Sequence, residues 1–189
     1  MTGFLMRLCS MTLRLAIDLV AIAPAVACAE ESPTSPDQQT AISIPNWICG
    51  REYENHAWGY TRSGAVIDGQ GRILSYQYSG SPPKFHSGDD YTEEELATRF
   101  EGAKPTEKSI PREELARILP LIGEASEGKM SEPKREGADM GSTTLYCLLH
   151  DSEKARYREI PLVYSGDASS ERDSESAKKL VGWLRASGF

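Results

Sequence analysis

Residues 57–67 form an apolar, β-rich stretch with the large β-formers Trp58 and Tyr60, and in residues 72–78 Leu74, Tyr76 and Tyr78 recur with a period of two. This period places every second side chain on the same face of a β-strand. Asp68, Gly69 and Gly71 lie between the two stretches. Glycine readily adopts the positive φ angles of a tight turn, and aspartate caps such a turn with its side chain. The pattern therefore predicts a β-hairpin with its turn at Asp68.

A second pair of β-type stretches follows later in the chain. Residues 143–150 are almost continuously apolar, which is typical of a central, well-buried strand. After a polar connection, residues 157–164 are again rich in aromatic and β-branched residues. The two stretches predict a second hairpin.

Three further stretches have helical signals. Thr92 and Glu95 have the spacing of a capping box, which predicts a helix start. Pro111 is suited to a first helical turn, and apolar residues recur with helical spacing after it. Pro120 is expected to interrupt or kink that second helix. A final amphipathic helix is predicted to begin near Asp173 or Ser174.

The order hairpin, two helices, hairpin, helix is typical of an α+β fold. We expect about four strands in a mostly antiparallel sheet, built from the two hairpins, with about three helices packed on one face. Residues 41–189 are long enough to form a single domain with a core of its own.

The first 29 residues differ in kind from the rest of the chain. Arg7 and Arg14 lie before an apolar run over residues 15–27, and this run ends in small residues. This is the layout of a secretory signal peptide, predicted here for residues 1–29. Residues 30–40 are polar and contain proline, so we expect a disordered tether there. The predicted location is extracytoplasmic, either periplasmic or secreted.

Two ways of processing this leader remain open. Cleavage after Ala29 leaves a mature chain that begins at Glu30. Alternatively, the residues up to Cys28 resemble a lipoprotein box, in which Cys28 carries a lipid that anchors the chain to a membrane. Ala25 stands where such boxes usually have leucine.

Two cysteines, Cys49 and Cys147, remain outside the leader. Two cysteines in an exported chain most often form a disulfide, which we predict here, and the alternative is two separate buried thiols. Neither has a second cysteine or a histidine at the spacing of metal ligands, so no metal site is assigned. We expect no cofactor.

The formal net charge of the chain is -7. Phosphate contacts need clustered lysine and arginine, so this balance argues against a nucleic-acid partner. Contact with a membrane is expected only through a lipid at Cys28.

Two segments carry a resemblance to other proteins. The stretches AWGYTRSGAVIDGQGRILSY and SGDASSERDSESAKKLVGWL resemble segments of exported bacterial proteins of unknown function. The resemblance implies a bacterial envelope or lipoprotein-like domain. It implies no activity, cofactor or catalytic residue.

We expect a non-catalytic module that binds a protein, a glycan or a small ligand. Trp58, Tyr60, Tyr76 and Tyr78 are candidates for a binding face, because exposed aromatic rings on a sheet make good contact surfaces. The alternative is that these rings pack in the core.

A small extracytoplasmic hydrolase is the alternative function. It requires His56 to approach a nucleophile or a carboxylate within hydrogen-bond distance. Ser63 and Asp68 are the nearest residues of the required types in the hairpin, while Cys49 and Cys147 are the possible thiol nucleophiles. No serine lies in a nucleophile-elbow motif, so no catalytic residue is assigned.

Overall fold

The structure, a computed structural model, describes residues 43–57, 59–81, 88–138 and 141–189. Several features expected from the sequence lie outside the described residues: the signal peptide at 1–29, the tether at 30–40, Cys28 and Trp58. Within the described ranges, no helix has both the length and the apolar character needed to cross a membrane.

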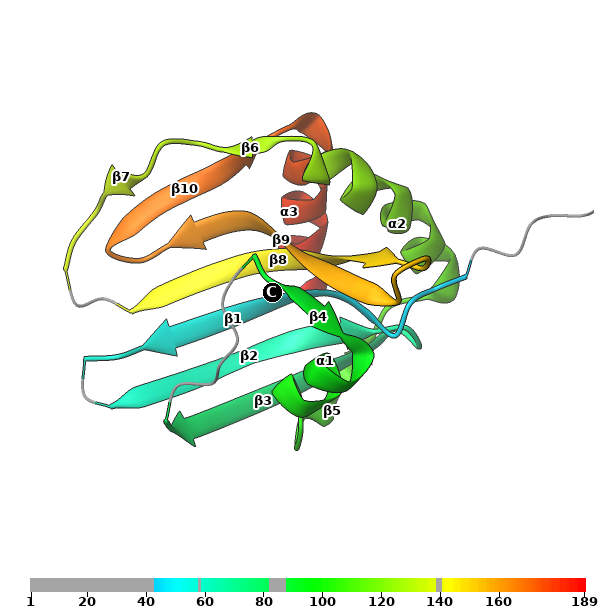
Figure 1. Cartoon of the computed structure of the whole chain (residues 1–189), viewed down its shortest axis with the longest axis horizontal. Coiled ribbons are helices and arrows are strands. Elements are labelled where there is room, and N and C mark those ends of the chain that lie inside the picture. Colours follow the sequence, from blue (N-terminus) through cyan, green and yellow to red (C-terminus); the bar gives the residue numbers. More distant parts are fainter. Residues whose placement is uncertain (1–42, 58, 82–87, 139–140) are drawn as a thin grey trace, which may run out of the picture. The chain divides into compact units, whose positions relative to one another are not determined.

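In the described part of the chain, the fold is built on one large antiparallel sheet of ten strands (Figure 1). Eight strands follow the order β5-β3-β2-β1-β8-β9-β10-β6, while β4 pairs with β9 and β7 pairs with β10. The strands are β1 (Trp47–Asn55), β2 (Tyr60–Asp68), β3 (Arg72–Gly80), β4 (Asp90–Thr92), β5 (Lys104–Ser109), β6 (Lys129–Met130), β7 (Lys134–Arg135), β8 (Ser142–Asp151), β9 (Arg156–Ser165) and β10 (Ala168–Asp173).

The prediction of a four-stranded sheet is therefore wrong. The four strands with a clear apolar pattern, β2, β3, β8 and β9, are present, but the others lack that pattern. Every residue of the edge strand β5 is exposed, and β6 and β7 are only two residues long each. Lysine and proline are common on edge strands because they hinder pairing with another chain, and they also remove the apolar alternation that reveals a strand.

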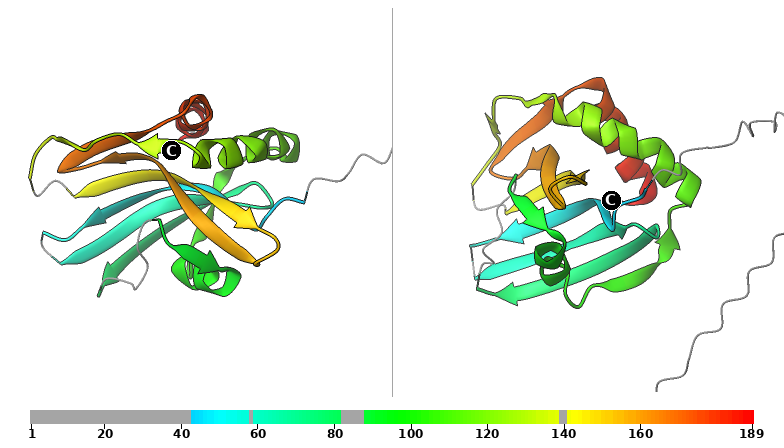
Figure 2. Two further views of the ribbon diagram at one scale, coloured as in Figure 1. Left: turned by 45° about the horizontal axis from the view of Figure 1, so that its top comes forward. Right: turned by 45° about the vertical axis from the view of Figure 1, so that its right-hand side comes forward.

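The helices pack on both faces of the sheet, so the expected packing on one face is also wrong. Helices α2 (Arg112–Ser126) and α3 (Glu175–Ser187) cover one face, while α1 (Glu93–Arg99) lies on the other (Figure 2, left). Two separate groups of buried residues result. One contains Cys49 and Cys147 beneath α2 and α3, and the other surrounds Tyr146 beneath α1. We call these two sides of the sheet the α2–α3 face and the α1 face.

The hairpin turn predicted at Asp68 is confirmed. The Asp68 Oδ1 atom accepts hydrogen bonds from the backbone N–H groups of Gln70 and Arg72, both at 2.9 Å. Gly71 has a φ angle of 80°, which a residue with a side chain rarely adopts. The Asp68 side chain also forms an ion pair of 2.7 Å with Arg72.

The helix starts predicted from the sequence are also confirmed. The Thr92 hydroxyl accepts from the Glu95 N–H at 3.2 Å, and the Glu95 carboxylate accepts from the Thr92 N–H at 2.7 Å. Ser174 caps α3 by accepting from the Ala177 N–H at 3.1 Å. Pro120 lies inside α2, which continues through it to Ser126.

The disulfide predicted between Cys49 and Cys147 is present. The two cysteines lie directly opposite each other on β1 and β8. These two strands join the half of the sheet that contains β2, β3 and β5 to the half that contains β9 and β10. The disulfide therefore links the two halves on the α2–α3 face, where both cysteines are fully buried.

Candidate functional site

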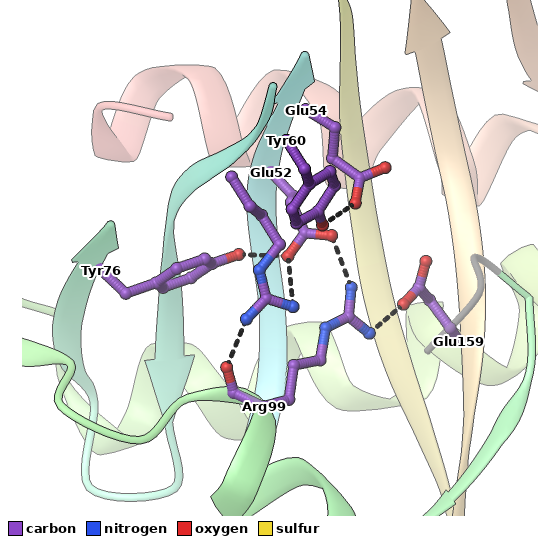
Figure 3. Close-up of polar contacts among 7 residues, drawn as sticks. Glu52, Glu54, Tyr60, Tyr76, Arg99 and Glu159 are labelled. Atoms are coloured by element: carbon purple, nitrogen blue, oxygen red, sulfur yellow. Dashed lines mark hydrogen bonds and ion pairs between the residues drawn. The ribbon is translucent and has the colours of Figure 1, made fainter. Parts of the chain in front are cut away.

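A group of buried charged residues lies on the α1 face, above the same pair of strands (Figure 3). Arg99, at the end of α1, reaches down to the sheet and lies between two carboxylates. Its Nη1 atom is 2.6 Å from Glu159 Oε2 on β9, and its Nη2 atom is 2.9 Å from Glu52 Oε1 on β1. The side chains of these three residues are at most 9% exposed.

Arg62 on β2 adds a second cation to this group. Its Nη2 atom donates a 2.7 Å hydrogen bond to the backbone carbonyl of Arg99, and its Nη1 atom lies 3.7 Å from Glu52 Oε2. The Tyr76 hydroxyl donates to the same Glu52 oxygen at 2.6 Å. We call these residues the buried charge network: Glu52, Arg62, Tyr76, Arg99 and Glu159.

Two glycines in the sheet make room for the tyrosine rings beside the network. A Cβ atom on Gly50 would lie 2.7 Å from the Tyr146 hydroxyl, and one on Gly64 would lie 2.7 Å from the Tyr76 hydroxyl. Burial raises the pKa of Tyr146 and also that of Tyr76, so both hydroxyls stay protonated at neutral pH. Both rings therefore fill space in their neutral form. The Tyr76 hydroxyl donates to Glu52, whereas the buried Tyr146 hydroxyl has no hydrogen-bond partner among the described residues.

The network is balanced in charge, with two glutamates and two arginines. Burial opposes the charged form of Arg99, but Tyr146, Glu159 and Glu52 together raise its pKa well above the usual value. Both glutamates are engaged by a guanidinium, so their negative charge is compensated inside the protein. This arrangement joins α1 to strands from both halves of the sheet, which is a structural role.

Sequence reasoning missed this network, although two signals for it existed. Arg62 has the same strand parity as Tyr60 and Val66, which are buried on the α1 face. Arg99 follows the buried Leu96 by three residues, so it lies on the inward side of α1. A charged residue at an inward position of an otherwise apolar pattern indicates a buried ion pair.

The aromatic residues proposed as a binding face do not share one exposed surface. Tyr60 and Tyr76 are buried, and Tyr60 donates a 2.6 Å hydrogen bond to Glu54. Tyr78 is 42% exposed. Trp58 lies outside the described residues.

The residues considered for a hydrolase lie apart from one another. His56 is exposed and contacts the ring of Tyr60, with 5.1 Å between the ring centres. Ser63 lies in a groove on the α2–α3 face, and Asp68 closes the hairpin turn at the far end of β2. Cys49 and Cys147 are joined in the disulfide, so neither is a free thiol.

A hollow of about 680 Å³ is lined by residues of β6, β7, β9, β10 and α3. Five cationic side chains line it, together with three acidic side chains and several serines. We call it the basic hollow and define it by its cations: Lys129, Lys134, Arg172, Lys178 and Arg185.

Four of these cations have no carboxylate partner among the described residues. In that part of the chain, Lys178 pairs with Glu175 at 2.8 Å, whereas Lys129, Lys134, Arg172 and Arg185 form no ion pair within 4.0 Å. These four come from β6, β7, β10 and α3. Among the described residues that line the hollow, five cations thus outnumber three carboxylates, which leaves an excess of two positive charges.

Arg172 is the most firmly held of the four. It is half-buried, and it donates from Nε to the Pro161 carbonyl and from Nη1 to the Gly128 carbonyl, both at 2.6 Å. Burial lowers the pKa of Arg172, and the positive charge of Arg158 lowers it further. Both effects mean that the positive charge at Arg172 lacks compensation from the protein.

A second concave surface, which we call the sheet groove, has a volume of about 710 Å³. Its floor is formed by small residues of β2 and β3, among them Ser63, Ala65 and Ser75. Arg51 and Lys104 are charged residues of this groove, and none of the described residues that line it is acidic. Both concave surfaces therefore favour negatively charged ligands.

Neither a protein-family model nor a curated protein or solved structure shows significant similarity to the chain. Function therefore has to be argued from the site itself.

Proposed function

We propose that this protein is an exported, non-catalytic module that binds an anionic ligand in the basic hollow. One observation carries the proposal: four cations without carboxylate partners among the described residues surround a single hollow in a chain of net charge -7. In such a chain, lysine and arginine on the surface usually have acidic neighbours. A hollow that concentrates the opposite sign attracts anions and holds them by charge-assisted hydrogen bonds.

The hydrogen bonds that hold Arg172 support a role for its guanidinium in binding an anion, beyond contact with water alone. Its hydrogen bonds to the Pro161 and Gly128 carbonyls fix the guanidinium before any ligand arrives. A fixed guanidinium loses little side-chain freedom on binding, which favours affinity. A bound anion also compensates the charge that burial and Arg158 disfavour.

Serine hydroxyls supply further donors to the hollow. The Ser131 oxygen accepts from the Glu171 N–H at 3.1 Å, which leaves the Ser131 hydroxyl hydrogen available to donate. Ser165 and Ser170 also line the hollow. Cations together with hydroxyl donors suit a ligand with several anionic oxygens, such as a carboxylate, sulfate or phosphate ester.

Export and an extracytoplasmic location are part of the proposal. The leader pattern of residues 1–29 supports them, and the disulfide between Cys49 and Cys147 is compatible with an oxidising compartment. Mass analysis of the product from a bacterial host tests this. A mature chain that begins at Glu30, or at a lipid-modified Cys28, supports export, whereas an uncleaved chain in the cytoplasm contradicts it.

Binding is tested by titrating the mature chain with inorganic sulfate and phosphate at constant ionic strength, with chloride as the reference salt. We expect backbone amide resonances of β6, β7 and β10 to shift. The double substitution Lys134→Ala and Arg185→Ala removes two of the free cations, and we expect it to weaken binding at least about tenfold.

A matched control changes two cations outside the hollow, Arg117→Ala and Lys154→Ala, both exposed. We expect this control to bind as the unchanged protein does. Equal weakening in both double variants indicates a general effect of net charge, and that result contradicts a site in the basic hollow.

A further inference from the structure

The basic hollow and the sheet groove lie on the same face of the sheet, and a row of polar side chains connects them. Residues paired directly across neighbouring strands point to the same face. The strand pairing defines a series of directly opposed residues that begins in the sheet groove and ends in the basic hollow. In order, these residues are Gln77, Ser63, Tyr53, Thr143, Ser165 and Ser169. We call them the polar row.

Each member of the polar row carries a hydroxyl or an amide, and none is buried. The row crosses β3, β2, β1, β8, β9 and β10. Neighbouring strands are about 4.8 Å apart, so the row is roughly 24 Å long. Lys134, which pairs with Ser169, extends it by one more strand into the basic hollow.

Cations lie near both ends of the polar row. Lys104 on β5 lies at the end in the sheet groove, and Lys134 lies at the other end. Arg51 also lines the sheet groove, but it lies on β1, two residues from Tyr53 in the middle of the row. Between them the row offers uncharged donors and acceptors at the regular spacing of the strands. Two of these groups also form hydrogen bonds within the protein: the Ser169 hydroxyl donates to Glu136 at 2.6 Å, and the Tyr53 hydroxyl accepts from Asn55 at 3.1 Å. Acidic sugar chains carry the matching groups, hydroxyls along the whole chain and anionic groups at intervals.

We propose that the polar row binds an acidic polysaccharide that lies across the strands, with its anionic groups at the basic hollow and the sheet groove. This inference rests on the proposed anion site and adds the class of ligand and the path that it takes. An extended sugar chain repeats at close to the strand spacing, so successive units meet successive members of the row. Hydrogen bonds between the sugar hydroxyls and the polar row then fix the orientation of the sugar chain, while the cations attract its anionic groups.

A peptide is less well matched to this surface. An extended peptide binds a sheet by adding a strand at an edge, through backbone hydrogen bonds. The polar row crosses the middle of the sheet, where strand backbones already pair with one another. An acidic peptide and a short DNA strand serve below as competitors of the same charge.

The test measures affinity for oligogalacturonates of two and six units, and for sulfated malto-oligosaccharides of the same two lengths. We expect the longer chain of at least one series to bind about tenfold more tightly than its dimer, because it makes additional hydrogen bonds along the row. Hexaglutamate and a DNA hexamer are expected to bind no better than the dimers, and a neutral cello-oligosaccharide only weakly.

The two neighbouring threonines of β8 provide a matched pair of variants. Thr143→Val removes a hydroxyl from the middle of the polar row with little change in shape, and we expect it to weaken binding of the six-unit chain about threefold to tenfold. It should leave binding of the dimer unchanged. Thr144→Val makes the same chemical change on the α1 face, opposite Glu52, and should affect neither ligand.

The outcomes separate this inference from the proposed function. If sulfate and dimers bind in the basic hollow but affinity does not rise with chain length, the polysaccharide path is wrong and the anion site stands. The polysaccharide path is equally wrong if Thr143→Val and Thr144→Val behave alike, or if hexaglutamate or DNA binds as well as the six-unit sugar. If no anion binds the basic hollow, both proposals fail.

Discussion

Replacement of Arg99 by methionine tests whether the buried charge network holds the two halves of the sheet together. Methionine keeps much of the length of the side chain but removes the guanidinium. Arg99 contacts Glu159 at 2.6 Å and Glu52 at 2.9 Å, and its side chain is 4% exposed. The substitution leaves Glu159 buried without the arginine, while Glu52 keeps its contacts with Arg62 and Tyr76.

Breaking a buried ion pair by removing one partner costs about 3–5 kcal/mol, because the remaining charge is desolvated without compensation. Two contacts are lost here, while Glu52 keeps its contacts with Arg62 and Tyr76. We therefore expect Arg99→Met to lower the free energy of unfolding by about 4 kcal/mol, a large part of the 5–15 kcal/mol that is typical of a folded domain.

Urea unfolding followed by tryptophan fluorescence measures this change. The reference is Arg156→Met, which removes an arginine whose side chain is 42% exposed and lies 3.9 Å from Glu95. An exposed pair contributes less than about 1 kcal/mol, so this variant should stay close to the unchanged protein. In the Arg99→Met background, Glu159→Gln should recover part of the loss, because it removes a buried negative charge that Arg99 no longer contacts.

Equal unfolding midpoints for Arg99→Met and Arg156→Met would refute the reasoning. That result would mean that the buried contacts contribute no more than a solvated pair. A lower midpoint together with no recovery by Glu159→Gln would point to lost packing of the side chain as the cause.

Three further predictions concern the rest of the fold. Replacing both Cys49 and Cys147 by alanine opens a loop with a sequence separation of 98 residues and should lower the free energy of unfolding in urea by about 4–5 kcal/mol. A loss below about 1 kcal/mol would contradict the view that the disulfide stabilises the fold by restricting the unfolded chain. Gly64→Ala places a Cβ against the Arg51 carbonyl and the Tyr76 hydroxyl and should lower the free energy of unfolding by about 1–3 kcal/mol. Gly182→Ala, which has open space at its Cβ in α3, should raise the free energy of unfolding by up to about 1 kcal/mol. Thermal unfolding of the two variants measures both changes. The pKa of Tyr146 is raised in the folded protein, so ionisation of this residue favours unfolding. The contribution of neutral Tyr146 to stability is fully present below about pH 10, the ordinary tyrosine value, and is lost as the pH rises above it. Tyrosinate absorbance of the buried rings should therefore appear together with unfolding.

The local signals in the sequence predicted local structure well. The Asp68 side chain accepts hydrogen bonds from residues two and four positions further along the chain, and Thr92 with Glu95 forms a cap of the same local kind. Such contacts depend on spacing along the chain, which the sequence displays directly. The disulfide was predictable for a different reason, because only two cysteines remain outside the leader.

The larger sheet and the charge clusters depend on contacts between distant segments. The sequence of β5, from Lys104 to Ser109, has no apolar alternation, and every residue is exposed. Only its pairing with β3 identifies it as a strand. The basic hollow brings Lys129 and Lys134 beside Arg172 and Arg185, which lie about 40 to 55 residues further along the chain. No periodicity connects such positions, so only the pairing of β10 with β6 and β7 reveals that they meet.

Mapping of backbone amide shifts during titration with sulfate tests the anion site most directly. The account predicts saturable shifts in β6, β7 and β10, around Lys134 and Arg172, that disappear when Lys134→Ala and Arg185→Ala are combined. It also predicts that the control variant with Arg117→Ala and Lys154→Ala retains them. Shifts spread over the whole surface, or shifts that persist in the hollow variant, would contradict a specific anion site in the basic hollow.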